Sequence, residues 1–348
     1  MSAPAPFRVT HLIPYDGIGG VESAARSMGE HQSADIDFRC HYIHAVPQTR
    51  AARLALFWPW SALRTALALR AFPPDLVIVS LWRSCIAALL AKLLRPQLQV
   101  ILFLHMARDA HAVDRWLTRA LARHAIEIWA DSAETGSRRL PGSSANRVIP
   151  FITARLSPAR PAPLVAPRFL YWGRLHPRKD LPRALGLFAA VYRRLPDARF
   201  EIIGPDGGAR ARVEARIAQL GLGDAVTLAG PLDQAAIARR AAGATFYLQT
   251  SREEGMAMSV VEAMQLGLVP VVTPAGEIAR YCQGGVNAIL VDGQDGGADE
   301  AAAAEVVDSL ADPAQLGGLR AAAIGTWAEA PLYAEAVLDA CREIRDAG

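Results

Sequence analysis

The sequence is poor in cysteine, and its few cysteines lie too far apart to form a C-x-x-C pair. The usual ligand spacings of zinc and redox sites are therefore missing. Without a pairing signal, we expect free thiols in a reducing cytoplasm. Lysine is scarcer still, because Lys92 and Lys179 are the only two. The four cysteines are Cys40, Cys85, Cys282 and Cys341.

Long apolar runs are absent as well. No stretch reaches the roughly 18 uninterrupted apolar residues that a membrane-spanning helix needs. The N-terminus has no charged segment followed by an apolar run, so we expect no signal peptide. With 52% hydrophobic and 20% charged residues, the composition is typical of a soluble globular protein. We expect a cytoplasmic protein.

Charge is divided unevenly along the chain. Residues 1–165 carry 19 Lys and Arg against 11 Asp and Glu, a net charge of +8. Residues 166–348 carry 18 against 23, a net charge of −5. We expect the basic half to meet an anionic partner. Phospholipid, a lipid-diphosphate acceptor and nucleic acid all fit that charge.

Short apolar segments alternate with helical patterns along most of the chain. Fully apolar segments such as Leu76–Val79 indicate strands buried on both faces, and hence parallel sheets covered by helices. The fold class predicted is α/β, with two tandem Rossmann-like doubly wound domains. The predicted strands include Phe7–Pro14, Phe38–Ala45, Asp75–Leu81, Gln99–His105, Arg168–Arg174, Phe200–Gly204, Ala225–Gly230, Thr245–Thr250 and Val269–Thr273.

A segment rich in proline and alanine, Pro158–Pro167, interrupts this alternation and is predicted to link the domains. We assign residues 1–160 to an N-terminal domain and residues 161–330 to a C-terminal domain. Residues 331–348 are predicted to form a final helix that can cross back to the first domain. Ligands of such sheets bind at the carboxyl ends of the strands, so side chains that follow strands are the candidates for chemistry.

Two of the candidate clusters supply anion-binding groups. Gly17–Glu22 follows the first strand and opens a helix, although its G-x-G-G spacing does not match the dinucleotide fingerprint. In the second domain, Gly173 is followed by Arg174 and Lys179, a guanidinium fork and a mobile ammonium suited to phosphate. Asp180 is predicted to cap the next helix.

A third cluster follows the apolar strand that ends at Thr250. Glu254 lies at the turn and Glu262 lies on the helix that begins after it. The backbone N–H groups of Gly255–Met258 stand at the helix start, where they can hold phosphates. Each carboxylate can accept hydrogen bonds from two neighbouring hydroxyl groups, so this pair is suited to a polyhydroxyl ligand.

These clusters, taken in order, resemble the family 4 retaining glycosyltransferases of glycosyl transferases group 1, which have the GT-B fold. The E-x7-E pair Glu254 and Glu262 carries the resemblance most clearly. It continues through PYDGIGGVE, the strand ending in His105, GRLHPRKD, IIGPDGG at 202–208 and VTLAGPL at 226–232. It implies two domains with a cleft between them.

The resemblance implies a role for each matching residue. Arg174 and Lys179 would bind the donor diphosphate, and Glu262 would bind the ribose hydroxyls. Glu254 would lie by the donor sugar, which His105 would also reach. Donor-binding backbone is expected at Gly19, Gly20, Gly173, Gly255, Met256, Ala257 and Met258. The sequence departs from the family pattern at Met256, where Phe is common, and at Ala257 and Asp180, where Gly is common.

The activity implied is transfer of a sugar from a UDP- or GDP-sugar to a hydroxyl acceptor, a glycan or lipid-linked precursor, with retention at the anomeric carbon. No metal or other cofactor is expected. The D-x-D sequence Asp35–Asp37 precedes a strand and should lie at the wrong edge of the sheet. Charge on the leaving diphosphate would be met by Arg174, Lys179 and helix N-termini.

Residues 50–72 combine arginines with large apolar residues, the profile of a helix that lies on a membrane surface. We assign a membrane-facing role to Arg53, Phe57, Trp58, Trp60 and Arg64, peripheral on the inner leaflet. A core helix with outward arginines is the alternative. Other functions left open are a sugar phosphorylase or a sugar-nucleotide epimerase with the same architecture. A non-catalytic module for anionic lipid also remains open, although neither it nor a nucleic-acid-binding module would explain the second-domain site. Nucleic acid is not expected as a partner.

Overall fold

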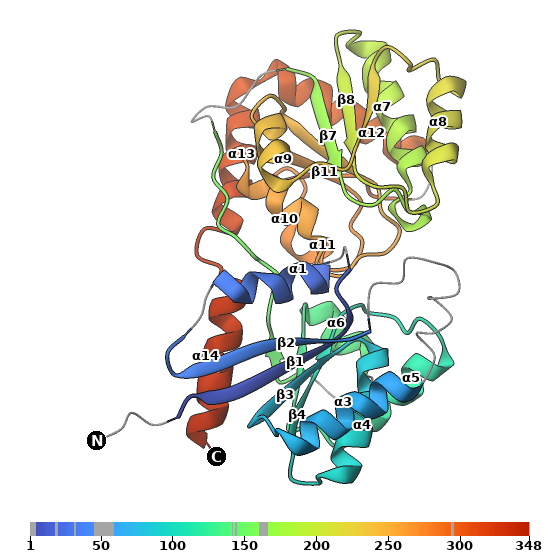
Figure 1. Cartoon of the computed structure of the whole chain (residues 1–348). Helices are drawn as coiled ribbons and strands as arrows, with labels where there is room; N and C mark the ends of the chain where they lie inside the picture. The colour runs from blue at the N-terminus through green and yellow to red at the C-terminus, as the bar shows by residue number, and fades with distance from the viewer. Residues whose placement is uncertain are drawn as a thin grey trace. The chain divides into compact units, whose positions relative to one another are not determined.

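The computed structural model describes residues 5–17, 20–30, 33–44, 59–140, 142, 145–159, 166–293 and 296–347. The chain forms two compact units (Figure 1). The first contains Met1–Ala154 together with Pro331–Gly348, and the second contains Arg155–Ala330. Within the part of the chain that is described, no helix combines the length and apolarity needed to cross a bilayer.

The first unit is built on a six-stranded parallel sheet with the order β2-β1-β3-β4-β5-β6. Its strands are β1 (Phe7–Tyr15), β2 (Ile36–His44), β3 (Leu76–Ser80), β4 (Gln99–Leu104), β5 (Glu127–Ala130) and β6 (Arg147–Val148). Its helices are α1 (Gly20–Ser27), α3 (Pro59–Ala71), α4 (Trp82–Leu94), α5 (Ala112–Ala122), α6 (Ala133–Arg139) and α14 (Tyr333–Ala347).

Alternate residues of the strands in this sheet contact different helices. Leu102 and Leu104 of β4 belong to a buried cluster with residues of α3, α4 and α5. Phe103 points the other way and stacks on Tyr333 of α14, with ring centroids 6.3 Å apart. Successive side chains of a strand point to opposite faces, so α14 covers the face opposite α4. Tyr333 is fully buried, and its backbone N–H donates to the carbonyl of Ile152.

The D-x-D sequence lies where the strand assignment predicted. Asp35 and Asp37 stand at the amino end of β2, the edge remote from the carboxyl ends of the strands. Asp35 is held by two arginines of α14, with Arg342 Nε 3.1 Å and Arg345 Nη1 2.9 Å from Oδ2. These arginines, Arg342 first, lower the pKa of Asp35. The carboxylate therefore ties the end of the chain to the sheet.

The second unit repeats the architecture with the strand order β12-β11-β10-β7-β8-β9, again all parallel. The strands are β7 (Arg168–Trp172), β8 (Arg199–Ile203), β9 (Val226–Gly230), β10 (Phe246–Gln249), β11 (Val269–Val272) and β12 (Ile289–Leu290). The helices are α7 (Leu181–Arg194), α8 (Arg210–Gln219), α9 (Gln234–Ala241), α10 (Met258–Gln265), α11 (Ile278–Tyr281), α12 (Gly296–Ala311) and α13 (Pro313–Thr326). The two doubly wound α/β units confirm the predicted fold class.

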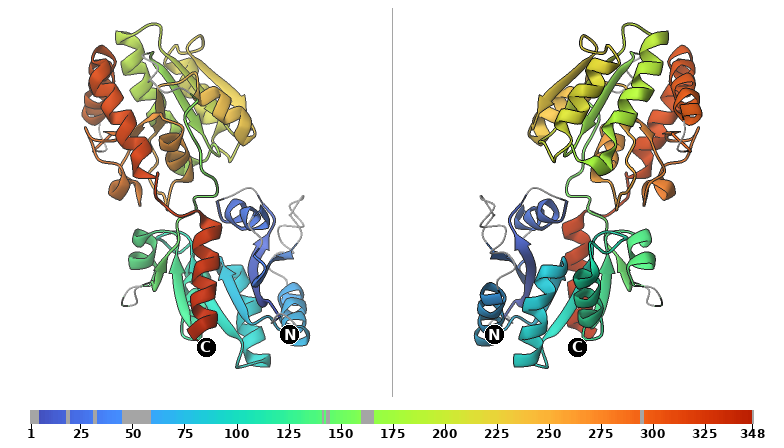
Figure 2. Two further views of the ribbon diagram at one scale, coloured as in Figure 1. Left: turned by 90° about the vertical axis from the view of Figure 1, so that its left-hand side faces the viewer. Right: turned by 90° about the vertical axis from the view of Figure 1, so that its right-hand side faces the viewer.

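Helices cover both faces of this sheet too (Figure 2). Phe169 of β7 packs edge-to-face on Phe188 of α7 at 5.5 Å. Trp172, three residues later and so on the other face, hydrogen-bonds to Glu262 of α10. Helix α7 packs against α8 and α12, whereas α10 packs against α13.

The division between the units falls after Ala154, earlier than the boundary predicted at residue 160. Arg155 Nη1 donates to the carbonyl of Ala328 at 2.9 Å, and the backbone N–H of Leu156 donates to Gln265 Oε1 at 3.1 Å. These contacts bind the segment to the second unit before the proline-rich stretch begins. Residues 160–165 of that stretch lie outside the described residues.

Candidate functional site

The carboxyl ends of β7 and β10 bring together residues that are far apart in the sequence. The two strands are neighbours in the sheet and pair in parallel. The turn after β7 carries Arg174, followed by a short 3₁₀ helix that ends at Lys179. The turn after β10 carries Glu254 and leads into α10. Topology alone therefore places both turns at one edge of the sheet.

Lys179 and Glu254 form an ion pair across this edge. Lys179 Nζ lies 2.6 Å from Glu254 Oε1, which also accepts a hydrogen bond of 3.1 Å from Gln249 Nε2. The Glu254 side chain is only 9% exposed, whereas the Lys179 side chain is 21% exposed. The ammonium group thus retains access to solvent while the carboxylate is enclosed. Its position makes Lys179 available to a negatively charged ligand at the same edge.

Gln249 is itself fixed by a buried hydrogen-bond network. Its Oε1 accepts from the hydroxyl of Tyr247 at 2.8 Å and from Ser259 Oγ at 3.1 Å. Because the carboxylate of Glu254 can only accept, the NH₂ group of Gln249 must be the side of the amide that faces it. Burial raises the pKa of Tyr247 well above its usual value, so this hydroxyl keeps its proton.

The N-terminus of α10 presents a row of unused donors. Among the described residues, the backbone N–H groups of Gly255, Met256, Ala257 and Met258 have no hydrogen-bond acceptor. The first N–H groups of a helix lack intrahelical partners and form a natural anion site. Ala257, which precedes the helix, has the left-handed backbone φ of 53° that favours glycine. This explains the frequency of glycine at that position in the family pattern.

The carbonyl groups of the same turn are already hydrogen-bonded to the segment that follows β11, which includes α11. Glu277 N–H donates to the carbonyl of Gly255 at 3.2 Å, and the Tyr281 hydroxyl donates to the carbonyl of Met256 at 2.9 Å. Gly276 lies so close that a Cβ atom there would stand 2.1 Å from the carbonyl oxygen of Glu254. The conformation of the turn is therefore fixed by its carbonyl groups, and its N–H groups have no acceptor among the described residues.

Glu262 lies on α10 beneath this turn, partly buried. Its Oε2 accepts a hydrogen bond of 2.7 Å from the indole N–H of Trp172. Burial raises the pKa of Glu262, and the bond from Trp172 partly opposes that rise. Among the described residues Oε1 has no hydrogen-bond donor, so one carboxylate oxygen remains for a hydroxyl ligand.

Arg174 is positioned by its backbone and by the stem of its side chain. Its carbonyl accepts from the Tyr171 hydroxyl at 3.2 Å. Its side chain crosses Gly207, where an added Cβ would lie 2.6 Å from Arg174 Cγ. Gly204 approaches Gly173 even more closely, since a Cβ added to Gly204 would lie 1.9 Å from the Gly173 carbonyl oxygen. Two glycines of the GPDGG segment thus let the turn after β8 lie directly under the turn after β7.

Asp180 is the N-cap residue of α7, as predicted, but its side chain does not cap the helix. It adopts a left-handed backbone with φ of 45°, which explains the glycine usual there. The carboxylate instead accepts from Arg252 Nε at 2.7 Å, and Thr250 Oγ1 donates to the Asp180 carbonyl at 2.9 Å. These bonds hold a conformation that an aspartate does not favour by itself.

In the first unit, His105 belongs to a buried chain of three polar side chains. Ser80 Oγ lies 2.7 Å from Nε2 of His105 and 2.7 Å from Nε2 of His11. Ser80 ends β3, which stands between β1 with His11 and β4 with His105 just beyond it. All three are buried, and burial lowers the pKa of His11 to about 3 and that of His105 well below its usual value. Both rings are neutral at physiological pH.

The single hydroxyl proton of Ser80 fixes how the two neutral rings differ. Ser80 can donate to only one of the Nε2 atoms, so the other ring must donate its own Nε2–H to the serine oxygen. One ring is therefore the Nε2–H tautomer and the other the Nδ1–H tautomer. Neither Nδ1 atom has a partner among the described residues. A neutral His105 supplies a hydrogen bond rather than a proton.

Of the remaining predicted residues, some belong to the described part of the chain and others lie outside it. Gly20 begins α1, while Gly19 lies outside the described residues. Arg53, Phe57 and Trp58 also lie outside them. In α3, Trp60 is 61% exposed and Arg64 is exposed, whereas the opposite face packs into the core of the unit.

Several residues of these sites were not predicted from the sequence. They are His11, Ser80, Trp172, Tyr247, Gln249 and Ser259. A polar side chain inside an otherwise apolar strand was the available signal, because such a group needs a partner when buried. The partner itself depends on the order of strands in the sheet.

Residues 156–323, which carry the second-unit site, match the glycosyl transferases group 1 family. The second unit is a member of that family.

A curated relative of this glycosyltransferase domain is the GDP-mannose:cellobiosyl-diphosphopolyprenol alpha-mannosyltransferase of Xanthomonas oryzae pv. oryzae, 30% identical over 124 residues. The matched stretch makes up 35% of the chain described here and 33% of the relative. The corresponding enzyme of Xanthomonas campestris is 31% identical over the same length. The matches thus span about a third of the curated relatives' length.

Solved structures resemble the whole chain in fold. Anabaena HepE, determined in complex with UDP and glucose, has a TM-score of 0.77 at 15% identity, over 98% of this chain and 100% of that one. Sucrose-phosphate synthase from Thermosynechococcus elongatus has a TM-score of 0.74 at 18% identity, over 98% and 100%. At these identities the likeness establishes the GT-B fold.

Proposed function

We propose that the protein is a glycosyltransferase that moves a sugar from a nucleotide diphosphate donor to a hydroxyl acceptor. The observation that carries the proposal is the edge of the second-unit sheet where Lys179 meets the unused N–H groups before α10. A cation and a helix N-terminus at one place favour a phosphate ligand, because both supply positive potential and hydrogen-bond donors. The family membership of the domain supports this reading.

The other donor contacts follow from the same edge. Arg174 would provide a second cation for the diphosphate, and Glu262 would accept from ribose hydroxyls through its remaining oxygen. Glu254 would accept from a sugar hydroxyl once Lys179 turns to the diphosphate. In that step the ligand phosphate replaces Glu254 as the partner of the ammonium group. The role predicted for His105 at the donor sugar remains a prediction.

Transfer is proposed to proceed with retention. The acceptor oxygen forms a bond to the anomeric carbon on the face that the diphosphate leaves, and the leaving phosphate oxygen takes the acceptor proton. Lys179, Arg174 and the α10 N-terminus stabilise the charge that develops on the diphosphate. An NMR assay of the product anomer tests this, and an inverted product would contradict it.

Donor binding is best measured first, since the base and the sugar are unassigned. A thermal-shift titration with UDP-, GDP- and ADP-sugars should raise the Tm with one base preferentially, because a ligand that binds the folded state stabilises it by mass action. UDP is bound by HepE, and GDP-mannose is named for the Xanthomonas relatives. The Lys179→Ala variant should lose most of the shift. No shift with any nucleotide sugar would remove the proposal.

Release of free nucleotide distinguishes the proposed transferase activity from other activities found on the same fold. A transferase releases a nucleoside diphosphate much faster with an acceptor hydroxyl than with water alone. A sugar phosphorylase would depend on inorganic phosphate, and an epimerase would return a nucleotide sugar. A lipid-linked or glycan acceptor is proposed because the Xanthomonas relatives act on a diphosphopolyprenol-linked sugar.

We also propose that the first unit contacts an anionic membrane surface through the outward sides of α3 and α5. Trp60 and Leu67 are exposed on α3, and Trp116 and Val113 are exposed on α5, each helix packing against α4. Arg64 and Arg115 accompany them on the exposed surface. Large apolar side chains beside arginines are typical of interfacial helices.

Vesicle co-sedimentation tests this surface. With vesicles containing anionic lipid, the wild type should sediment and the Trp60→Ser, Trp116→Ser double variant should remain in the supernatant. Val286→Ser, which removes an exposed apolar residue of the second unit, is the matched control and should sediment as the wild type does. Equal sedimentation of the double variant would exclude α3 and α5 as the contact.

A further inference from the structure

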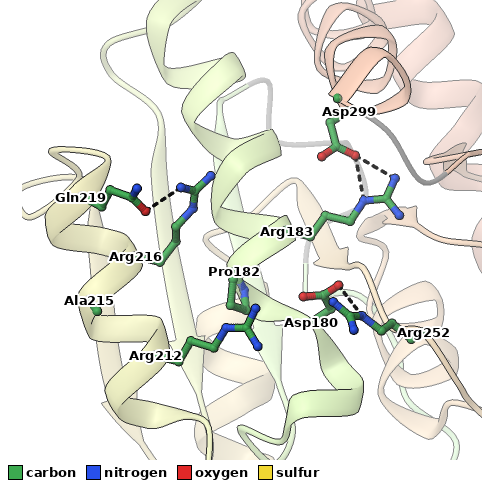
Figure 3. A pocket seen from close by; sticks show the side chains of 10 residues that line it. Asp180, Pro182, Arg183, Arg212, Ala215, Arg216, Gln219, Arg252 and Asp299 are labelled. Carbon is green, nitrogen blue, oxygen red and sulfur yellow. Dashed lines mark hydrogen bonds and ion pairs between the residues drawn. The ribbon is translucent and has the colours of Figure 1, made fainter.

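A cavity of about 660 Å³ opens beside the turn of Lys179, within the second unit (Figure 3). It is lined by the first turn of α7, by one side of α8, by the loop after β10 and by the start of α12. Four arginines and two aspartates contribute to the lining: Arg183, Arg212, Arg216, Arg252, Asp180 and Asp299.

Among the described residues that line this cavity, ion pairs neutralise two of the four guanidinium groups. Arg183 pairs with Asp299 at 2.8 Å, and both side chains are less than one fifth exposed. This pair joins α7 to α12 and is structural. Arg252 pairs with Asp180 at 2.7 Å, but its side chain is 60% exposed. For the described lining residues, two carboxylates against four guanidinium groups leave an excess of two positive charges.

The excess charge comes from α8. Arg216 donates to the neutral side chain of Gln219 at 2.7 Å. Arg212 has no hydrogen-bond or ion-pair partner among the described residues. Figure 3 shows Arg212 reaching from α8 toward Pro182, and Arg252 reaching toward Asp180 from the other side. Guanidinium groups from two different elements therefore converge on one opening.

We propose that this cavity binds a small phosphate-bearing molecule at a site separate from the donor site. The planar fork of an arginine matches two oxygens of a phosphate group, and Arg212 and Arg252 supply two such forks, while Arg216 adds positive charge to the lining. A phosphate dianion balances the excess charge. Repulsion among unpaired guanidinium groups falls when the dianion binds, which favours occupancy.

The site is linked to the turn that holds Lys179. Arg252 fixes Asp180 through its side chain, and its backbone N–H donates to the carbonyl of Arg178 at 2.9 Å. A phosphate that draws Arg252 from Asp180 releases one of the bonds that hold the left-handed backbone at Asp180, next to Lys179. Occupancy of the cavity then changes donor affinity. This second step rests on the proposed function, whereas binding of phosphate does not.

The test is a titration of the intact protein with inorganic phosphate, followed by calorimetry and thermal shift, with chloride added to keep the ionic strength constant. The wild type should bind phosphate saturably. Arg212→Gln, which breaks no described contact, should weaken binding about tenfold, the loss of one charge-assisted interaction. Arg239→Gln, an exposed arginine on α9, is the matched control and should bind as the wild type does.

Lys179→Ala separates the two phosphate sites. Phosphate affinity that survives Lys179→Ala and falls in Arg212→Gln supports the cavity. Affinity lost in Lys179→Ala and unchanged in Arg212→Gln would overturn it, since phosphate would then occupy the donor site alone. A response that chloride reproduces would also overturn it. Nucleotide-sugar binding is measured separately on the same variants, so failure of the proposed function leaves the phosphate result interpretable.

Discussion

The hydroxyl of Ser80 contacts two buried histidines at once. Its removal should lower the free energy of unfolding considerably, although the side-chain volume changes little. In the Ser80→Ala variant, Nε2 of His11 and Nε2 of His105 both face a methyl group in place of an oxygen 2.7 Å away. Each buried polar group left without a partner costs about 1–3 kcal/mol, so the free energy of unfolding should fall by about 2–6 kcal/mol. A change of tautomer relieves neither ring, because both Nε2 atoms meet the same methyl group.

Ser84 provides a matched control for this measurement. It is a fully buried serine of α4 whose hydroxyl has no hydrogen-bond partner among the described residues. Ser84→Ala removes an unsatisfied polar group, so it should leave stability unchanged or raise it slightly. Urea unfolding of the two variants compares the loss of a shared hydroxyl with the loss of an unshared one. Similar unfolding midpoints for the two would refute the reasoning.

Long-range ¹⁵N–¹H NMR of the imidazole rings gives a second, independent measurement. In the wild type, His11 and His105 should appear as opposite tautomers, since one hydroxyl serves both. Ser80→Ala should abolish that fixed relation. Two rings in the same tautomer in the wild type would show that the serine does not bridge them.

Three further outcomes are expected. Gly276→Ala should lower the free energy of unfolding by at least about 1–3 kcal/mol and weaken donor binding, because it adds a Cβ 2.1 Å from the Glu254 carbonyl oxygen at a left-handed φ of 59°. Gly285→Ala is the control for the backbone alone, because its φ is 70° and an added Cβ meets open space. Equal donor affinity in both variants would contradict the steric argument. Because burial raises the pKa of Glu262 in the folded state, this carboxyl stabilises the fold most below its unfolded pKa and loses that contribution as pH rises through its folded pKa. Glu262→Gln should therefore be stabilised relative to the wild type more at about pH 7 than at about pH 4, and urea unfolding that shows no such difference would mean that the carboxyl is solvated. Arg139→Met should lower the free energy of unfolding by about 3–5 kcal/mol, because it leaves the buried Asp114 without its ion-pair partner. The exposed neighbour provides the control, since Arg138→Met should lower it by at most about 1 kcal/mol. Equal denaturant midpoints for the two variants would place Arg139 on the surface.

The sequence was sufficient for the parts of the fold that depend on local pattern. Apolar segments such as Leu76–Val79 predicted buried parallel strands because their side chains are apolar on both faces. The charged and glycine residues that directly follow predicted strands indicated the edge of the sheet at which a ligand binds. The GPDGG segment contributed only to the family resemblance, and its glycines allow a close approach of the turns after β7 and β8 that only glycine permits.

What the sequence could not supply was the order of strands across each sheet. The ion pair of Lys179 and Glu254 depends on β10 lying beside β7, although 75 residues separate the two side chains. The bridge from Ser80 to both histidines likewise depends on β3 lying between β1 and β4. The Asp180 side chain followed no local rule, because a distant Arg252 competes with the helix N–H groups for its carboxylate.

The return of α14 to the first unit has a consequence for synthesis of the chain. Tyr333 fills a buried position against Phe103 and Phe151, so the core of the first unit is incomplete until residues from 331 onward have left the ribosome. Residues 155–330 form the second unit without interruption. During translation the later-made unit can thus finish folding before the one that begins the chain, the reverse of the usual order for multidomain proteins.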